Sequence, residues 1–286
     1  MIEVIYRIDP NDPNPGETPG TAAEARAQLE SGNRTFATLL DNPGSSPEPV
    51  RRVIQITAAD LGLSAIGGTM LTQTPFALVV GCADARVPIE LILGQGVNDL
   101  FVLRVAGNVL GSEIKGSVDF ALQNLPSIVL VVVLGHSRCG AVTAATRAFL
   151  DPAEYLGLSA DHELRSIVNQ LFPAVRLAHT SMISAWGSDA ERHRGFVPSL
   201  VETAAVVNSA LMAAVLRNEL VTQGRESVEA VYGVYDLDTR RVGVFEPAHA
   251  VGDGLSLLDP PLDSAGFTEL SMRVAHGPFV SGLMGA

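Results

Sequence analysis

The chain is poor in cysteine and has neither long apolar runs nor a surplus of basic residues. Only two cysteines occur among 286 residues, which argues against a disulfide scaffold and is typical of a reducing compartment. The longest strongly apolar run, 128–134, has seven residues, whereas a membrane-spanning helix needs about 20. Acidic residues outnumber basic ones by 31 to 19, and a nucleic-acid-binding protein would carry the opposite imbalance. The first residues lack the basic and apolar regions of a secretory signal, so we expect a cytoplasmic protein that binds neither membrane nor nucleic acid.

The composition is that of a folded globular chain. Apolar residues make up 47% of it and charged residues only 17%, which excludes disorder along the whole length. The length allows one large domain or two small ones. Residues 10–20 are rich in proline and glycine, so we expect a flexible segment over 1–20 and order from residue 21 onward.

Five short apolar segments predict strands, and helical patterns separate the first four. They are Phe76–Gly81, Asp99–Arg104, Ser127–Leu134, Val228–Tyr235 and Arg241–Phe245. The first three are continuously apolar, which is typical of parallel strands buried on both faces, and the gaps between them are long enough for crossover helices. The last two are joined by a segment too short for a crossover, so the fifth strand should pair antiparallel at an edge. The sequence therefore predicts an α/β fold.

The regions outside these strands carry weaker signals. Thr21 and Glu24 resemble a capping box at the start of a helix, which we expect to be interrupted near Gly32. The polar stretch 151–195 is expected to add helix rather than a separate domain. The last part, 247–286, is rich in glycine and proline and reads as a C-terminal extension.

Both cysteines come just after a predicted parallel strand, where ligand sites form in open α/β sheets. Cys82 follows the first strand and Cys139 the third, with His136 three residues before Cys139. Two thiolates and one imidazole suit zinc, and three protein ligands are typical of a catalytic zinc with an open position. The alternative is that both cysteines are small buried core residues. A histidine at the matching turn favours the metal.

An aspartate and an arginine follow the first cysteine at two-residue intervals. A lone Asp-x-Arg is more often a surface ion pair of little energetic value. Beside a metal, Asp84 held by a bidentate Arg86 can instead accept a proton from bound water and orient the resulting hydroxide. We therefore predict that Asp84 and Arg86 are catalytic residues.

These motifs, CADARVP from 82 and GHSRCGAV from 135, closely resemble the β-class carbonic anhydrases. The resemblance extends to DLFVLRVAGN at 99–108, LESGNRTFA at 29–37 and VYGVYD at 231–236. It implies a β-carbonic anhydrase-like zinc domain over 21–246 that contains the insert 151–195. The implied fold is a four-stranded, mostly parallel sheet with an antiparallel fifth edge strand, flanked by helices, with an N-terminal helical arm. The implied assembly is a homodimer, or a higher oligomer of dimers, formed through exchanged N-terminal helices.

The resemblance also implies roles for individual residues. Cys82, His136 and Cys139 would bind one zinc ion per chain, and Asp84 with Arg86 would orient the nucleophile. The residues implied to contact carbon dioxide or bicarbonate are Gln73, Phe101, Ala106 and Phe120. Gln73 is typical of the plant-type, open-site members, and Val79 stands where members with a bicarbonate effector site have tryptophan. We therefore expect an open site, with Asp84 bonded to Arg86 rather than to zinc.

The activity implied is reversible hydration of carbon dioxide to bicarbonate and a proton. Three other functions remain possible interpretations of the sequence. The first is a serine hydrolase, because the segment 135–139 nearly forms the Gly-x-Ser-x-Gly elbow of that class, although Cys139 replaces its second glycine. The zinc could also be noncatalytic, or serve hydrolysis of carbon disulfide or carbonyl sulfide. The other histidines, at 162, 179, 193, 249 and 276, have no ligand spacing and are expected at the surface or in the core, although one could carry protons from the site.

Overall fold

The computed structural model describes residues 2–8, 18–41, 50–62, 72–158, 162–243 and 257–285. Its central sheet has five strands in the order β4-β3-β5-β6-β7. Their bounds are β3 Ala77–Gly81, β4 Leu100–Arg104, β5 Leu130–His136, β6 Glu229–Tyr235 and β7 Val242–Gly243. Strands β4, β3, β5 and β6 are parallel, and β7 is antiparallel to β6 at one edge. The predicted α/β fold with an antiparallel fifth edge strand is confirmed.

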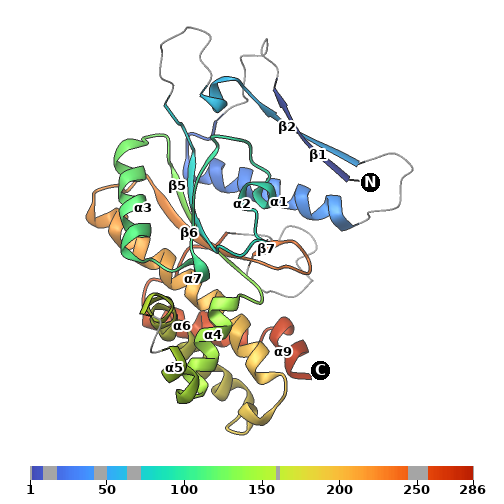
Figure 1. Cartoon of the computed structure of the whole chain (residues 1–286), viewed down its shortest axis with the longest axis vertical. Coiled ribbons are helices and arrows are strands. Elements are labelled where there is room, and N and C mark those ends of the chain that lie inside the picture. Colours follow the sequence, from blue (N-terminus) through green and yellow to red (C-terminus); the bar gives the residue numbers. More distant parts are fainter. Residues whose placement is uncertain are drawn as a thin grey trace.

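Helices cover both faces of this sheet (Figure 1). The helices are α1 Ala22–Asp41, α2 Ile89–Leu93, α3 Ser112–Asn124, α4 Gly140–Leu150, α5 Pro152–Gly157, α6 His162–Trp186, α7 Phe196–Thr222, α8 Ser264–Ala275 and α9 Pro278–Gly285. Short 3-10 turns lie at Ala59–Leu61, Ala106–Asn108 and Ala190–Arg192. The helix over 162–186 lies inside the predicted insert and packs on α4 and α7 as part of the same body.

The continuous apolar runs of the strands are explained by two separate cores. Alternate residues of a strand point to opposite faces. Leu78 and Val80 of β3 pack with the large core that includes α4, α6 and α7, while Ala77 and Val79 pack with the core under α1 and α2. Because both faces are covered, neither set of positions can be polar.

Helix α7 runs through the larger core. By length and composition it is the one helix in the described ranges that is apolar enough to cross a membrane, but 83% of its most apolar window is buried inside the fold. It packs against β5, β6, α6 and α8. It is therefore a core helix of this domain.

Helix α1 begins as the sequence predicts but continues further. The Glu24 carboxylate accepts hydrogen bonds from the Gly20 and Thr21 backbone N–H groups, and the Glu24 N–H donates to the Thr21 hydroxyl, which confirms the capping box. The predicted interruption near Gly32 is wrong, because α1 is unbroken over 20 residues. A Cβ at Gly32 would lie 1.8 Å from the Leu93 carbonyl oxygen, so this glycine permits close packing of α1 on the end of α2.

Two features at the ends of the chain were not predicted. Residues Ile2–Ile8 form strand β1, which pairs parallel with β2, Val50–Ile56, in a separate two-stranded sheet. These seven residues correct the expectation of a flexible segment over 1–20, while 9–17 lie outside the described residues. In the C-terminal extension, 257–285 form α8, α9 and a bridge from Leu258 to Tyr232 of β6. This part of the extension packs on the central domain.

Candidate metal centre

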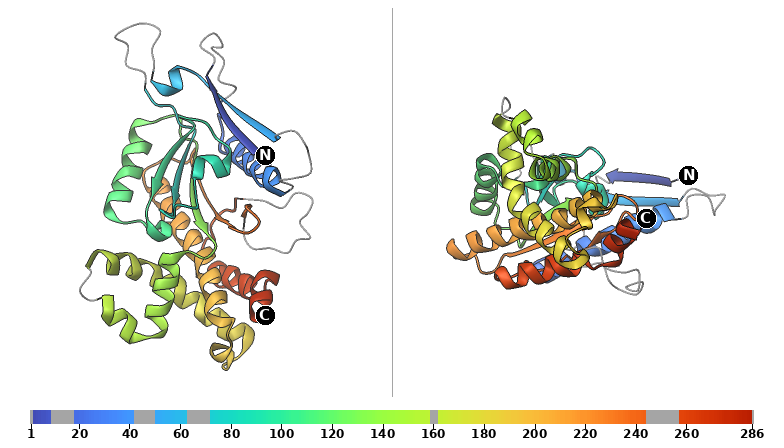
Figure 2. Two further views of the ribbon diagram at one scale, coloured as in Figure 1. Left: turned by 45° about the vertical axis from the view of Figure 1, so that its right-hand side comes forward. Right: turned by 90° about the horizontal axis from the view of Figure 1, so that it is seen from below.

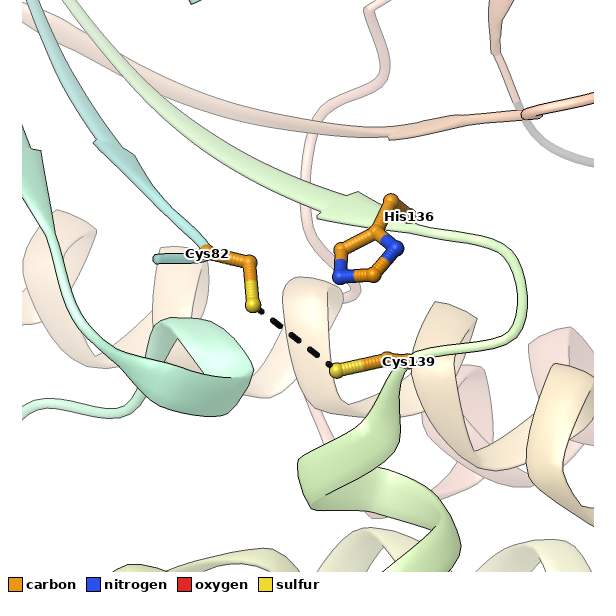
Figure 3. Close-up of side chains that lie close together, drawn as sticks. All are labelled: Cys82, His136 and Cys139. Atoms are coloured by element: carbon orange, nitrogen blue, oxygen red, sulfur yellow. Dashed lines mark hydrogen bonds between the residues drawn. The ribbon is translucent and has the colours of Figure 1, made fainter. Parts of the chain in front are cut away.

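Three side chains converge at the carboxyl ends of β3 and β5, two adjacent parallel strands (Figure 3). Cys82 is the first residue after β3, and His136 is the last residue of β5. Cys139 is the residue before α4 and comes three residues after His136. The short turn between them returns the chain to the same edge of the sheet. All three residues are buried, at 4%, 0% and 1% exposure respectively.

The spacing of these three side chains fits one metal ion. One donor atom from each lies within 4.8 Å of the others, and the two sulfur atoms are 3.9 Å apart. Two sulfurs bound to a tetrahedral zinc at about 2.3 Å would be about 3.8 Å apart. The sulfur separation therefore matches a shared zinc, whereas a disulfide needs about 2.05 Å.

The histidine presents a free nitrogen to this space. Nδ1 of His136 lies 2.9 Å from the Ser137 carbonyl oxygen, so Nδ1 carries the proton and Nε2 has the lone pair. Nε2 is buried and has no hydrogen-bond partner among the described residues. A buried acceptor without a partner is costly, and a metal ion at this position would satisfy it.

The two thiols share one ionisation. The pKa of Cys82 is lowered, chiefly because the Cys139 thiol donates to its sulfur, and the Gly107 N–H also points at that sulfur at 3.4 Å. The pKa of Cys139 is raised by the adjacent Cys82 thiolate and by burial. A bound cation would favour the second thiolate, so this pair suits a site that releases a proton when metal binds.

Asp84 and Arg86 form a bidentate pair beside the cluster. The guanidinium donates from Nε to Oδ1 at 3.0 Å and from a terminal nitrogen to Oδ2 at 2.7 Å, and the Arg86 backbone N–H also donates to Oδ1. These bonds hold the pKa of Asp84 well below its usual range. Oδ2 of Asp84 lies 3.8 Å from Nε2 of His136, so an ionised carboxylate faces the metal position without leaving Arg86.

Comparison with known proteins agrees with this geometry. A family model described as "Carbonic anhydrase" matches residues 77–242, which is more than half of the chain and includes all three candidate ligands. The chain belongs to this carbonic anhydrase family, in its β class.

Relatives with known names match parts of the chain. "Carbonic anhydrase 2" of Mycobacterium tuberculosis is 39% identical over 126 residues, which cover 44% of this chain and 58% of that protein. "Carbonic anhydrase" of Mycolicibacterium smegmatis is 39% identical over 112 residues, or 39% of this chain and 52% of that protein. The chain thus spans about half the length of the curated relatives it matches. Among solved structures, the β-carbonic anhydrase CafA of Aspergillus fumigatus is 20% identical, with a TM-score of 0.49 over 69% of this chain and 82% of that chain.

The four residues predicted to contact substrate lie on different elements of the chain. Phe101 on β4 is half-buried against the larger core, and Ala106 lies in the 3-10 turn after β4, next to Gly107. Gln73 is exposed in the segment before β3, and Phe120 on α3 is 52% exposed. No contact of Gln73 or Phe120 with the metal cluster is among the interactions of the described residues, so their roles stay predictions.

Several residues that hold the site together were not predicted. Arg104 donates to the carbonyl oxygens of Cys82 and Asp84, and so fixes the loop between them. Gly107, whose N–H points at the Cys82 sulfur, is anchored through its carbonyl oxygen by Asn208 of α7. These are backbone contacts between distant segments, and no spacing along the chain reveals them.

The turn that carries two of the ligands is fixed from both sides. Arg138 has a positive φ of 54°, and its N–H donates to the buried carboxylate of Glu202 on α7 at 2.9 Å. The Ser137 hydroxyl donates to Asp236 and accepts from the Leu237 N–H. Ser137 is fully buried, so it is not the exposed nucleophile that a hydrolase elbow requires.

The other histidines that the structure describes stand apart from the cluster. His162 lies beside Arg165, His179 pairs with Glu191, and His193 accepts from the Gly195 N–H. His276 caps α8. His249 lies outside the described residues. No second group of metal-binding side chains occurs in the ranges that the structure describes.

Proposed function

We propose that the protein catalyses the reversible hydration of carbon dioxide to bicarbonate, using one zinc ion per chain held by Cys82, His136 and Cys139. The observation that carries this proposal is the convergence of two thiols 3.9 Å apart and an unpartnered imidazole nitrogen beside a bidentate aspartate–arginine pair. Membership of the carbonic anhydrase family supports it. When bound, zinc would lower the pKa of a water molecule and so supply a hydroxide nucleophile near neutral pH.

The residues of the chain would each have a distinct task. Cys82 and Cys139 supply negative charge, and His136 supplies a neutral donor whose ring is oriented by the Ser137 carbonyl oxygen. The ionised Asp84 carboxylate accepts a hydrogen bond from the nucleophile and so orients its lone pair toward substrate. Arg86 holds that carboxylate in place through two charge-assisted hydrogen bonds.

We further propose that the site is of the open type near neutral pH. Support comes from the three hydrogen bonds that tie Asp84 to Arg86, because together they occupy both oxygens of the carboxylate. Activity should then rise smoothly with pH as a single ionisation. A crystal structure of the zinc-loaded protein near pH 7.5 tests this, and an Asp84 oxygen at about 2.0 to 2.2 Å from zinc would contradict it.

The wider setting of the enzyme stays a proposal as well. We propose a cytoplasmic homodimer or oligomer of dimers, with the zinc domain over 21–246 and the C-terminal extension over 247–286. Gln73, Phe101, Ala106 and Phe120 are proposed to line the substrate pocket.

Variants of the two parts of the site separate metal binding from turnover. Cys82→Ser and Cys139→Ser should lose the zinc, measured as metal per chain in protein purified without chelator. Arg86→Ala should keep one zinc but lose about 10- to 100-fold of the hydration rate, the usual cost of removing a group that orients a metal ligand. Arg192→Ala is a matched control, because Arg192 is an exposed arginine that pairs with Asp189 and lies away from Asp84.

Three results would contradict the proposal. They are zinc-free parent protein, unchanged zinc in the cysteine variants, and zinc without turnover. Sulfide release from carbon disulfide or carbonyl sulfide, with no hydration of carbon dioxide, would identify the related hydrolase instead.

A further inference from the structure

Strand β1 presents a free edge. Among the described residues β1 pairs only with β2, and the two form a sheet of their own. Figure 2 shows β1 on the outer side of β2, projecting from the rest of the molecule. Two strands alone are marginally stable in water, and an exposed edge offers a row of unpaired N–H and C=O groups to another chain.

The faces of β1 also remain partly uncovered. In β2, Ile54 and Ile56 are buried against the domain. Their neighbours on β1 in the observed register, Tyr6 and Ile8, lie on the same face but are 45% and 46% exposed. The apolar face that β2 buries is therefore continued by β1 into solvent.

The sequence of β1 is complementary to itself in the antiparallel direction. In IEVIYRI, Glu3 and Arg7 are equally distant from Ile5, as are Val4 and Tyr6. We propose that β1 pairs antiparallel with β1 of a second copy of this chain about a two-fold axis at Ile5, which forms a four-stranded intermolecular sheet. Each Glu3 then faces the partner's Arg7, and each Val4 faces the partner's Tyr6, an aromatic and β-branched pair of the kind that stabilises sheets.

The register is restricted by both geometry and charge. Opposing residues of an antiparallel pair point to the same face of the sheet. If the pair is symmetric, one strand can therefore slide along the other only by two residues at a time. One such step would place Glu3 opposite Ile5 and lose both ion pairs. The register centred on Ile5 is therefore the one that pairs each acid with a base.

The charges on β2 fit the same arrangement. Arg51 already donates from Nε to Glu3 at 2.6 Å, and Glu3 and Arg51 are neighbours in the parallel register. Arg7 has no ion pair with another described residue and lies beside Gln55. Four side chains would then lie side by side across the four strands: Arg51, Glu3, the partner's Arg7 and the partner's Gln55. Glu3 would lie between two cations.

A cysteine at the symmetry axis tests the pairing directly. In the proposed sheet the two copies of residue 5 are opposite each other, within disulfide reach, so Ile5→Cys should form a disulfide-linked dimer under mild oxidation. Val53→Cys is the matched control. Val53 is the β2 neighbour of Ile5 on the same face, but its two copies would be about 14 Å apart across three strand spacings, too far to bridge.

Charge reversal provides the second measurement. Arg7→Glu and Glu3→Arg each place like charges opposite one another and should weaken the association made through β1 about tenfold or more, measured by analytical ultracentrifugation. A mixture of the two variants restores both opposite-charge pairs and should associate again. Arg192→Glu makes the same charge change at an exposed site away from β1 and should leave association unchanged.

The pairing is overturned if Ile5→Cys gives no more cross-linked dimer than Val53→Cys. It is also overturned if the mixed variants associate no better than each variant alone. Neither result depends on zinc content or hydration activity, so the proposed function is tested separately.

Discussion

Replacing Glu202 by glutamine should change how stability depends on pH. Glu202 is 4% exposed on α7, and one of its oxygens accepts the Arg138 N–H while the other has no hydrogen-bond partner among the described residues. Burial raises the pKa of Glu202 to about 7 from an ordinary value of 4.5, with a further contribution from nearby Asp236. The carboxyl group is therefore protonated in the folded chain at pH values where it is ionised in the unfolded chain.

The sign and size of the effect follow from this difference. Between pH 4.5 and about 7 the folded chain holds a proton that the unfolded chain has lost, so the free energy of unfolding falls as the pH rises. Each tenfold difference in proton affinity corresponds to about 1.4 kcal/mol, so the total loss is on the order of 3 kcal/mol. Glu202→Gln keeps an acceptor for Arg138 but cannot ionise. The variant should therefore gain stability relative to the parent as the pH rises through this window.

Urea unfolding of zinc-loaded parent and Glu202→Gln, at matched pH values from about 5 to about 8, measures this difference. Both proteins keep the same metal ligands, so the pH dependence of zinc binding cancels when the two are compared at equal pH. Glu154→Gln, which removes a charge from an exposed position on α5, should instead give a constant offset from the parent. A constant difference between Glu202→Gln and the parent across the range would refute the reasoning.

Two further predictions concern α1. Gly32→Ala should destabilise the fold by about 1 to 3 kcal/mol, because its Cβ would overlap the Leu93 carbonyl oxygen, and thermal unfolding measures this. Exposed Ser31→Ala is its control on the same helix, and equal unfolding midpoints for the two would contradict the close packing. Thr21→Ala should cost about 1 kcal/mol by removing the hydroxyl that accepts the Glu24 N–H. Thr21→Ser, which retains the hydroxyl, should stay near the parent, and an equal loss in Thr21→Ser would argue against the cap.

The metal ligands and the sheet could be predicted because each is encoded locally. A parallel strand covered on both faces must be apolar throughout, so the segments around 78 and 132 stand out from their surroundings. The ligands follow such strands directly, and the carboxyl ends of neighbouring parallel strands meet at one edge. Cys82 and His136 could therefore be placed together without knowledge of the helices between them. Strand β1 was also open to prediction, since IEVIYRI places apolar residues at every second position.

The hydrogen bonds that hold the loops of the site could not be predicted, because they join segments that are distant in the sequence. Arg138 has a positive φ, and its N–H is held by Glu202, 64 positions later in the chain. Gly107, whose N–H points at the Cys82 sulfur, is held at its carbonyl oxygen by Asn208. Both contacts come from α7, whose sequence signals a long apolar helix but does not reveal which loops its two polar side chains meet.

What the sequence alone determined is therefore the chemistry of the site and the layer that carries it, since donor types and apolar runs are properties of single segments. The tertiary structure decided that α1 continues through Gly32 and which backbone groups orient the ligands. It also decided that β1 lies outside the central sheet. The Leu93 carbonyl oxygen beside Gly32 and the Glu202 carboxylate beside Arg138 are atoms on other elements that take part in these decisions. The positions of such atoms are fixed only when the whole chain has folded.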